Sequence, residues 1–167
     1  MAGMIDQLAD VMKEQTERHN ELYGLSLEEK EAIIKNDIDT LQKLVNLKNM
    51  VISQNNRLEK QRISLVKDIA DVMGNKKDDL SLADVIEILK EQPAEQEKLR
   101  EAGNLLKEAV SKLKEANDIN KSLLESSLEF VEYSLNALRS TIAPEHLEYP
   151  IRPNPGGGDA VSFNATR

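Results

Sequence analysis

Residues 117–142 read NDINKSLLESSLEFVEYSLNALRSTI and decide how the chain must fold. Residues three or four apart share one face of a helix, and here that face is apolar except where it begins. Its members are Asn117, Asn120, Leu124, Leu128, Val131, Leu135, Leu138 and Ile142. An apolar stripe of this length needs another surface to cover it, because soluble proteins rarely expose large contiguous apolar patches. Fold and function both depend on what covers the stripe.

The composition is typical of long amphipathic helices. The 167 residues have room for one domain, and they include 22 Lys and Arg against 30 Asp and Glu, a net charge of −8. Aromatic residues make up only 3% of the chain, whereas 31% of residues are charged. Sheet-rich domains usually carry more Val, Thr, Tyr and Phe. We therefore expect an all-α protein.

Apolar periodicity and capping signals predict three long helices and one short one. The expected ranges are 5–34, 38–72, 81–90 and 93–142. Ser26 and Glu29 resemble a capping box that could restart a helix, but we expect the first helix to be continuous. The last helix would have about 50 residues, against 30 to 36 for each of the others.

The helix ends are predicted from single residues. Asn36 is expected to cap the second helix, and Gly74 to end it in the left-handed conformation that glycine tolerates. Ser81, with Asp84 three residues on, is expected to cap the short helix. Pro93 suits the first position of the last helix, where its missing N–H costs nothing.

These elements predict an elongated antiparallel bundle of three long helices plus one short helix. The bundle would comprise residues 1–142. Residues 143–167 hold four of the five prolines and a run of three glycines, so we expect a disordered, flexible tail there.

Composition also argues against several classes of partner. An acidic chain lacks the Lys and Arg excess that nucleic acids and anionic membranes attract. No apolar stretch approaches the roughly 20 residues that span a bilayer, so no membrane insertion is expected. The opening MAGMIDQLADVMKE has no basic segment followed by an apolar block, which predicts no signal peptide. Because cysteine is absent, the chain also fits a reducing compartment, and we expect a cytoplasmic protein.

No pattern of catalytic or metal-binding residues was found. Di-iron bundles use Glu-x-x-His pairs, but Thr16 precedes His19 and Ala143 precedes His146 at that spacing. Phosphate-binding, dinucleotide-binding and nucleophile-elbow glycine motifs are also absent from the sequence. We expect no catalytic residue, no metal, no cofactor and no enzymatic activity.

Two interpretations of the stripe stay open from the residues alone. It could be an intramolecular seam, or part of it could be a docking face for another amphipathic helix. The surplus length of the last helix favours a docking face, because about 20–30 Å of stripe would lack a neighbour of equal length. An Asn in an apolar seam fixes register at a cost in stability, which suits a reversible contact.

The chain resembles the FlgN-type flagellar type III export chaperones. The resemblance rests on the run from Asn117 to Glu125, on the leucine stripe after it, and on the layout of helices around LEKQRISL at 58–65. It implies a cytoplasmic chaperone that binds the C-terminal helical segments of the hook–filament junction proteins, prevents premature assembly and delivers them to the export gate.

The resemblance also implies functional positions. The cargo-binding face would comprise Asn117, Asn120, Leu124, Leu128, Val131, Leu135 and Leu138. Tyr149, shortly after the last helix, would dock on the cytoplasmic domain of the export gate. The alternatives are an adaptor or chaperone bundle of another secretion system, a coiled-coil structural homodimer, and an enzyme built on a helical bundle. Whether the protein forms a weak homodimer stays open.

Overall fold

A computed structural model describes the backbone of residues 2–74 and 80–142 and the side chains of residues 3–74 and 80–140. These residues form α-helices and one short 3-10 helix. The elements are α1 (Ala2–Lys35), α2 (Ile38–Val72), α3 (Leu82–Ile88), η1 (Leu89–Glu91) and α4 (Pro93–Ile142). The predicted all-α fold is confirmed, with 34, 35 and 50 residues in the three long helices. Within the described ranges, no helix is long and apolar enough to cross a membrane.

Most of the predicted helix ends are confirmed. Helix α1 continues through Ser26 without a break. Ser81 and Asp84 form a capping box at the start of α3, and Pro93 is the first residue of α4. Gly74 follows α2 with a φ of 71°, the left-handed conformation expected of it. The predicted tail, residues 143–167, lies outside the described residues.

The prediction that Asn36 caps α2 is wrong. Asn36 has a φ of 53° and ends α1, donating its N–H to the Ile33 oxygen over 3.1 Å. The N–H of Asp37 donates to the Ala32 oxygen over 2.9 Å, which completes a Schellman motif. Asp37 then caps α2, because its carboxylate accepts the Thr40 N–H over 3.0 Å. Hydrogen bonds from Thr40 also lower the pKa of Asp37. One two-residue link thus ends one helix and begins the next.

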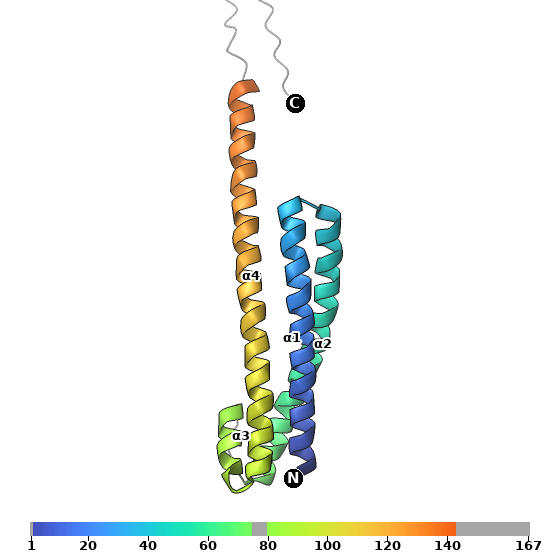
Figure 1. The fold of residues 1–167 in the computed structure, drawn as a ribbon, viewed down its shortest axis with the longest axis vertical. Coiled ribbons are helices and arrows are strands. Elements are labelled where there is room, and N and C mark those ends of the chain that lie inside the picture. Colours follow the sequence, from blue (N-terminus) through green and yellow to red (C-terminus); the bar gives the residue numbers. More distant parts are fainter. Residues whose placement is uncertain (1, 75–79, 143–167) are drawn as a thin grey trace, which may run out of the picture. The chain divides into compact units, whose positions relative to one another are not determined.

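The chain divides into two units, residues 1–130 and 131–167. In the first unit, α1 and α2 run antiparallel and form a hairpin (Figure 1). The short α3 lies beside the first turns of α4, at the end of this unit that also holds the N-terminus (Figure 1). In the second unit, the described residues are 131–142, all of them helical.

The hydrophobic core of the first unit gathers residues from all four α-helices and η1. Its buried members are Ile5, Leu8, Ala9, Met12, Val66, Ile69, Val85, Leu89 and Leu99. The early turns of α1 and α4 therefore pack against the last turns of α2 and against α3. The α1–α2 hairpin also carries an interhelical polar contact, since Gln15 Nε2 donates to Glu59 Oε2 over 2.8 Å.

Replacing Leu99 tests this core. Leu99 is 0% exposed, whereas Leu105 on the same helix is 52% exposed. Leu99→Ala should lower the free energy of unfolding by about 2–5 kcal/mol, because it removes apolar contacts and leaves a cavity. Leu105→Ala is the matched control and should cost under about 1 kcal/mol. Urea denaturation followed by circular dichroism measures both, and equal losses would contradict the described core.

Candidate functional site

Five polar side chains link α4 to the α1–α2 hairpin. We call them the polar ring: Ser26, Glu29, Lys48, Asn117 and Asn120. Asn117 Oδ1 accepts hydrogen bonds from Ser26 Oγ over 3.0 Å and from Lys48 Nζ over 3.3 Å. Asn120 Nδ2 donates to the Ser26 backbone oxygen over 2.8 Å and to Glu29 Oε2 over 2.9 Å. Lys48 Nζ pairs with the same Glu29 oxygen over 2.8 Å, which closes the ring.

The polar ring is largely shielded from water. Asn120 is 3% exposed and Ser26 is 0% exposed. The Lys48 and Glu29 side chains are 16% and 13% exposed. Buried polar groups are costly unless they are paired, so this arrangement favours a single register of α4 against the hairpin. The two asparagines thus both contact the hairpin, although Asn120 is buried and Asn117 is exposed to solvent.

Beyond the ring, the stripe of α4 is exposed. In the first unit, Leu124 is 42% exposed and Leu128 is 64% exposed. In the second unit, Val131 is 51%, Leu135 is 46% and Leu138 is 56% exposed. The structure therefore separates the seven predicted site residues into two groups. The asparagines contact the hairpin, while the five aliphatic residues have large apolar surfaces open to solvent.

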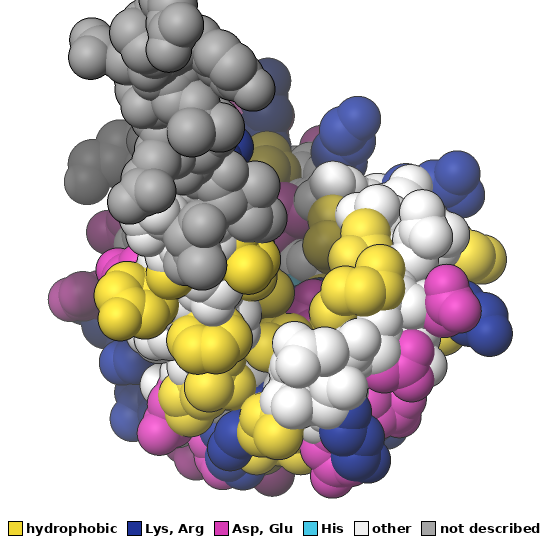
Figure 2. Space-filling view, turned by 90° about the horizontal axis from the view of Figure 1, so that it is seen from above, with side chains coloured by type: hydrophobic (Ala, Val, Ile, Leu, Met, Phe, Trp, Pro, Cys, Tyr) yellow, Lys and Arg dark blue, Asp and Glu magenta, His cyan; other side chains and the backbone are white. Residues whose placement is uncertain are grey.

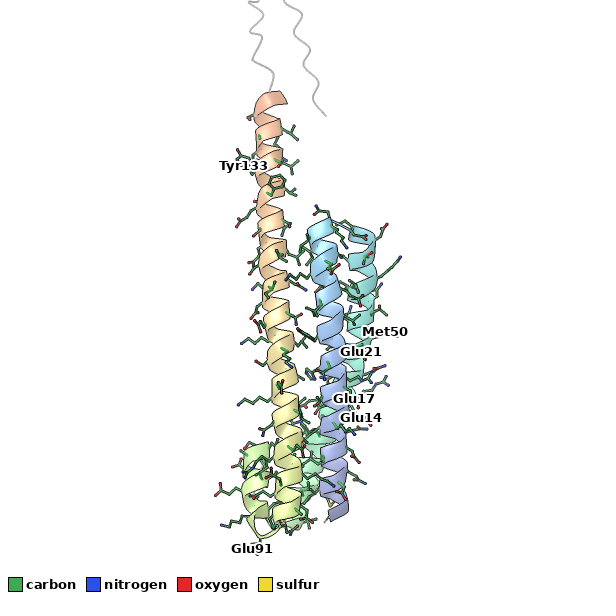
Figure 3. All side chains as sticks on the ribbon, in the orientation of Figure 1. Glu14, Glu17, Glu21, Met50, Glu91 and Tyr133 are labelled. Atoms are coloured by element: carbon green, nitrogen blue, oxygen red, sulfur yellow. The ribbon has the colours of Figure 1, made fainter. Side chains whose placement is uncertain are left out.

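Three residues of the polar ring are not identified by the sequence pattern. Ser26 and Glu29 resemble a local capping signal, and no sequence signal marks Lys48. Two aromatic side chains outside the stripe, Phe130 and Tyr133, are 71% and 73% exposed, and Tyr133 projects from α4 (Figure 3). Aromatic residues make up only 3% of the chain, so two of them three residues apart on one helix are a signal that could have been used.

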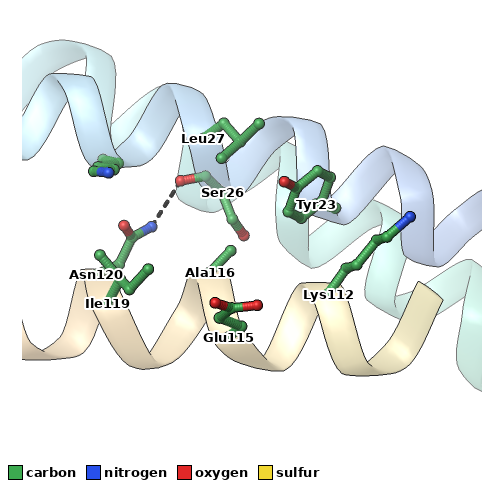
Figure 4. Close-up of a pocket in the computed structure, with 9 residues that line it drawn as sticks. Tyr23, Ser26, Leu27, Lys112, Glu115, Ala116, Ile119 and Asn120 are labelled. Carbon is green, nitrogen blue, oxygen red and sulfur yellow. Dashed lines mark hydrogen bonds between the residues drawn. The ribbon is translucent and has the colours of Figure 1, made fainter. Parts of the chain in front are cut away.

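A small pocket lies beside the polar ring, between α1 and α4 (Figure 4). Its volume is about 150 Å³, and Tyr23, Leu27 and Ile119 contribute its apolar lining. Ligand pockets usually have about 300–1,000 Å³, so this one suits at most a single side chain. Lys112 lies at the pocket and pairs with Glu108 over 2.8 Å, and that carboxylate raises the pKa of Lys112.

A metal site is not indicated within residues 3–74 and 80–140. No group of three or more His, Cys, Asp or Glu residues there is placed to hold a metal ion. The ring nitrogen Nδ1 of His19 lies 2.7 Å from the Gln15 backbone oxygen one turn earlier, within hydrogen-bonding distance. His146 and Tyr149 lie outside the described residues.

An α-helical bundle with an exposed apolar face on its longest helix has the kind of surface against which amphipathic helices pack. The comparison with protein families identifies the family. The family model described as FlgN protein matches residues 1–149, and the chain belongs to this family. It is therefore a flagellar export chaperone, of a family that binds export substrates and is not enzymatic. No curated protein and no solved structure matches the chain.

Removing one charge tests the polar ring. Glu29→Gln should lower the free energy of unfolding by about 1–3 kcal/mol, because it leaves the Lys48 ammonium shielded from water without a carboxylate. The matched control is Glu31→Gln on the same helix. Glu31 pairs with Lys35 at side-chain exposures of 73% and 70%, and its loss should cost under about 0.5 kcal/mol. Denaturation midpoints compare the two variants, and similar costs would show that the ring adds no more than a surface ion pair.

Proposed function

We propose that this chaperone binds the C-terminal helical segments of the hook–filament junction proteins. It holds them in the cytoplasm, prevents their premature assembly and delivers them to the export gate. The observation that supports this proposal is the exposed aliphatic stripe of α4, because a chaperone for helical segments needs an apolar surface that its own fold leaves uncovered. Family membership decides against an adaptor of another secretion system.

The apolar part of the proposed cargo face comprises the five aliphatic residues Leu124, Leu128, Val131, Leu135 and Leu138. Fully burying a side chain of this kind is worth about 1.5–3 kcal/mol, so an amphipathic helix laid along the stripe gains enough to bind stably. Asn117 and Asn120 belong to the same proposed face, at its beginning. Their contribution is to hold α4 against the hairpin, so that Leu124 and Leu128 are presented in a fixed register.

Binding of a cargo helix along the stripe would both prevent its premature assembly and allow its later release. Cargo helices that are covered by the stripe cannot pair with one another, so assembly is blocked until the gate is reached. Ser127 lies among the leucines, and its hydroxyl donates to the Leu123 backbone oxygen over 2.9 Å within α4 itself. Polar groups of this type add no attraction for an apolar partner, which keeps the complex reversible.

Delivery requires a second contact, and we propose that Tyr149 makes it. The support is its place in the sequence, seven residues after the end of α4 and at the last residue that the family model matches. The cargo face and the gate contact would then lie in different parts of the chain. A loaded chaperone could dock without first losing its cargo.

Reversing polarity at the stripe tests cargo binding. Leu128→Glu should reduce co-purification of the C-terminal fragments of the junction proteins at least about tenfold, because cargo would have to bury a carboxylate. Circular dichroism should stay helical, since Leu128 is 64% exposed. The control is Met50→Glu on α2, where the side chain is 62% exposed and projects away from α1 (Figure 3). Normal cargo binding by the Leu128 variant would refute the stripe as the site.

The gate contact is tested by Tyr149→Ala. This variant should retain cargo binding and lose binding to the purified cytoplasmic domain of the export gate. Tyr133→Ala removes another exposed tyrosine and should leave gate binding unchanged. Binding measured by calorimetry with cargo-loaded chaperone separates the two steps, and intact gate binding by the Tyr149 variant would contradict the assignment.

A further inference from the structure

Helix α2 carries a second exposed apolar surface, which we call the α2 column. It comprises Ile38, Val45 and Ile52, which are 68%, 46% and 42% exposed. Their spacing of seven residues is that of a helix that packs along another helix. The adjacent positions Leu44 and Val51 are only 3% and 5% exposed and form the buried side of α2. The α2 column is therefore separate from the face that packs within the hairpin.

The α2 column lies on the side of α2 that approaches α4. Lys48 is three residues after Val45 and four before Ile52, so it shares their side of the helix. Its ammonium reaches Asn117 on α4 over 3.3 Å. Asn117 begins the stripe that continues with Leu124 and Leu128. Two exposed apolar surfaces, one on each helix, thus flank the same polar contact.

In the view from above, hydrophobic side chains gather toward the middle of the picture, and charged side chains lie mostly around its rim (Figure 2). A helix that packs against the α2 column and against Leu124 and Leu128 would contact α2 along one side and α4 along the other. It would bury two apolar surfaces that the fold leaves open, and it would rest above the polar ring.

The edge of the α2 column indicates the chemistry of the partner. Gln42, Asn49 and Asn56 each lie four residues, about one helical turn, after a member of the α2 column, so they form one edge of it. All three are exposed. Such flanking positions usually carry charges that select the partner. In a chain with 31% charged residues, residues 49–56 contain none. An amide edge suits a helix whose own flanks are uncharged and polar, such as Asn, Gln, Ser or Thr.

Charge also distinguishes a foreign helix from a second copy of this chain. Two copies would bring net charges of −8 together, and three of the acidic residues, Glu125, Glu129 and Glu132, lie close to the stripe on α4. Like charges oppose association at the low dielectric of an interface. A partner helix of low charge avoids this repulsion. The observations therefore favour a client segment over self-association.

We infer that the α2 column is a second wall of the cargo site, and that one amphipathic client helix with uncharged polar flanks packs against α2 and against the first-unit part of α4, at Leu124 and Leu128. This inference rests on the function proposed above. It adds Ile38, Val45 and Ile52 as residues that select the client, and it places the client's C-terminal helix beside the hairpin rather than on α4 alone.

Matched substitutions on α2 test the inference. Val45→Glu should weaken binding of the junction-protein C-terminal fragments at least about tenfold, because it introduces a carboxylate into an apolar contact. Leu47→Glu is the control, since Leu47 is 48% exposed, close to the 46% of Val45, and lies on the other side of α2. It should change the affinity less than about twofold. Circular dichroism and urea midpoints check that both variants fold.

The outcomes separate the inference from the proposed function. Loss of binding in Leu128→Glu with normal binding in Val45→Glu would overturn the second wall and leave the α4 site standing. Normal binding in both would overturn both. Sedimentation velocity tests whether a second copy of this chain binds the α2 column instead. If Val45→Glu dissociates a dimer that Leu47→Glu retains, and client binding is unchanged, the column is a self-association surface and the inference is wrong.

A second measurement does not depend on introducing a charge. The chain contains no cysteine, so single-cysteine variants report on one position each. The thiol of Val45→Cys or Ile52→Cys should react at least about fivefold more slowly with a maleimide when the client fragment is present, because a bound helix covers it. The thiol of Leu47→Cys or Met50→Cys should react at the same rate with and without the fragment. Equal rates at all four positions would refute the second wall.

Discussion

The structure depends on the hydrogen bonds of the polar ring. Asn120 donates to both Ser26 and Glu29, so sliding α4 along the hairpin would break several bonds at once. The hydrophobic core near α3 supplies most of the apolar burial, but apolar contacts alone tolerate shifts in register. The ring adds the directional contacts that such a core lacks. It thereby sets which residues of α4 face the hairpin and which stay open.

Helix α4 therefore has a part that is buried in the first unit and a part that is exposed. Toward its beginning, α4 buries Leu99, Ala109 and Ala116 against the rest of the first unit. After Asn120, the same helix exposes leucines that no part of the described chain covers closely. The stripe is therefore continuous in sequence but changes its role at the ring. We propose that a client helix bound beyond the ring completes the packing that the fold begins.

The sequence predicted the helices well, but it did not predict where the stripe changes from asparagines that contact the hairpin to leucines that are exposed. Local signals sufficed for α3 and the start of α4, because Ser81 and Pro93 act within one turn. The prediction for Asn36 is wrong because both Asn36 and Asp37 can cap a helix, and only the backbone shows which residue is left-handed.

The burial of the stripe residues is harder to predict from the sequence. Each four-residue step from Asn120 to Leu124 to Leu128 advances about 40° around the helix, so a buried asparagine and an exposed leucine appear on one stripe. Ser26 and Glu29 looked local because their partners are about ninety residues away in sequence.

Hydrogen exchange with and without a client fragment tests the central claim most directly. The account predicts that a saturating junction-protein C-terminal fragment slows exchange of the backbone amides of residues 123–140, while residues 93–110 change little because they are already packed in the core. Unchanged exchange at 123–140, with the fragment shown to be bound, would contradict the claim that the exposed stripe of α4 receives the client.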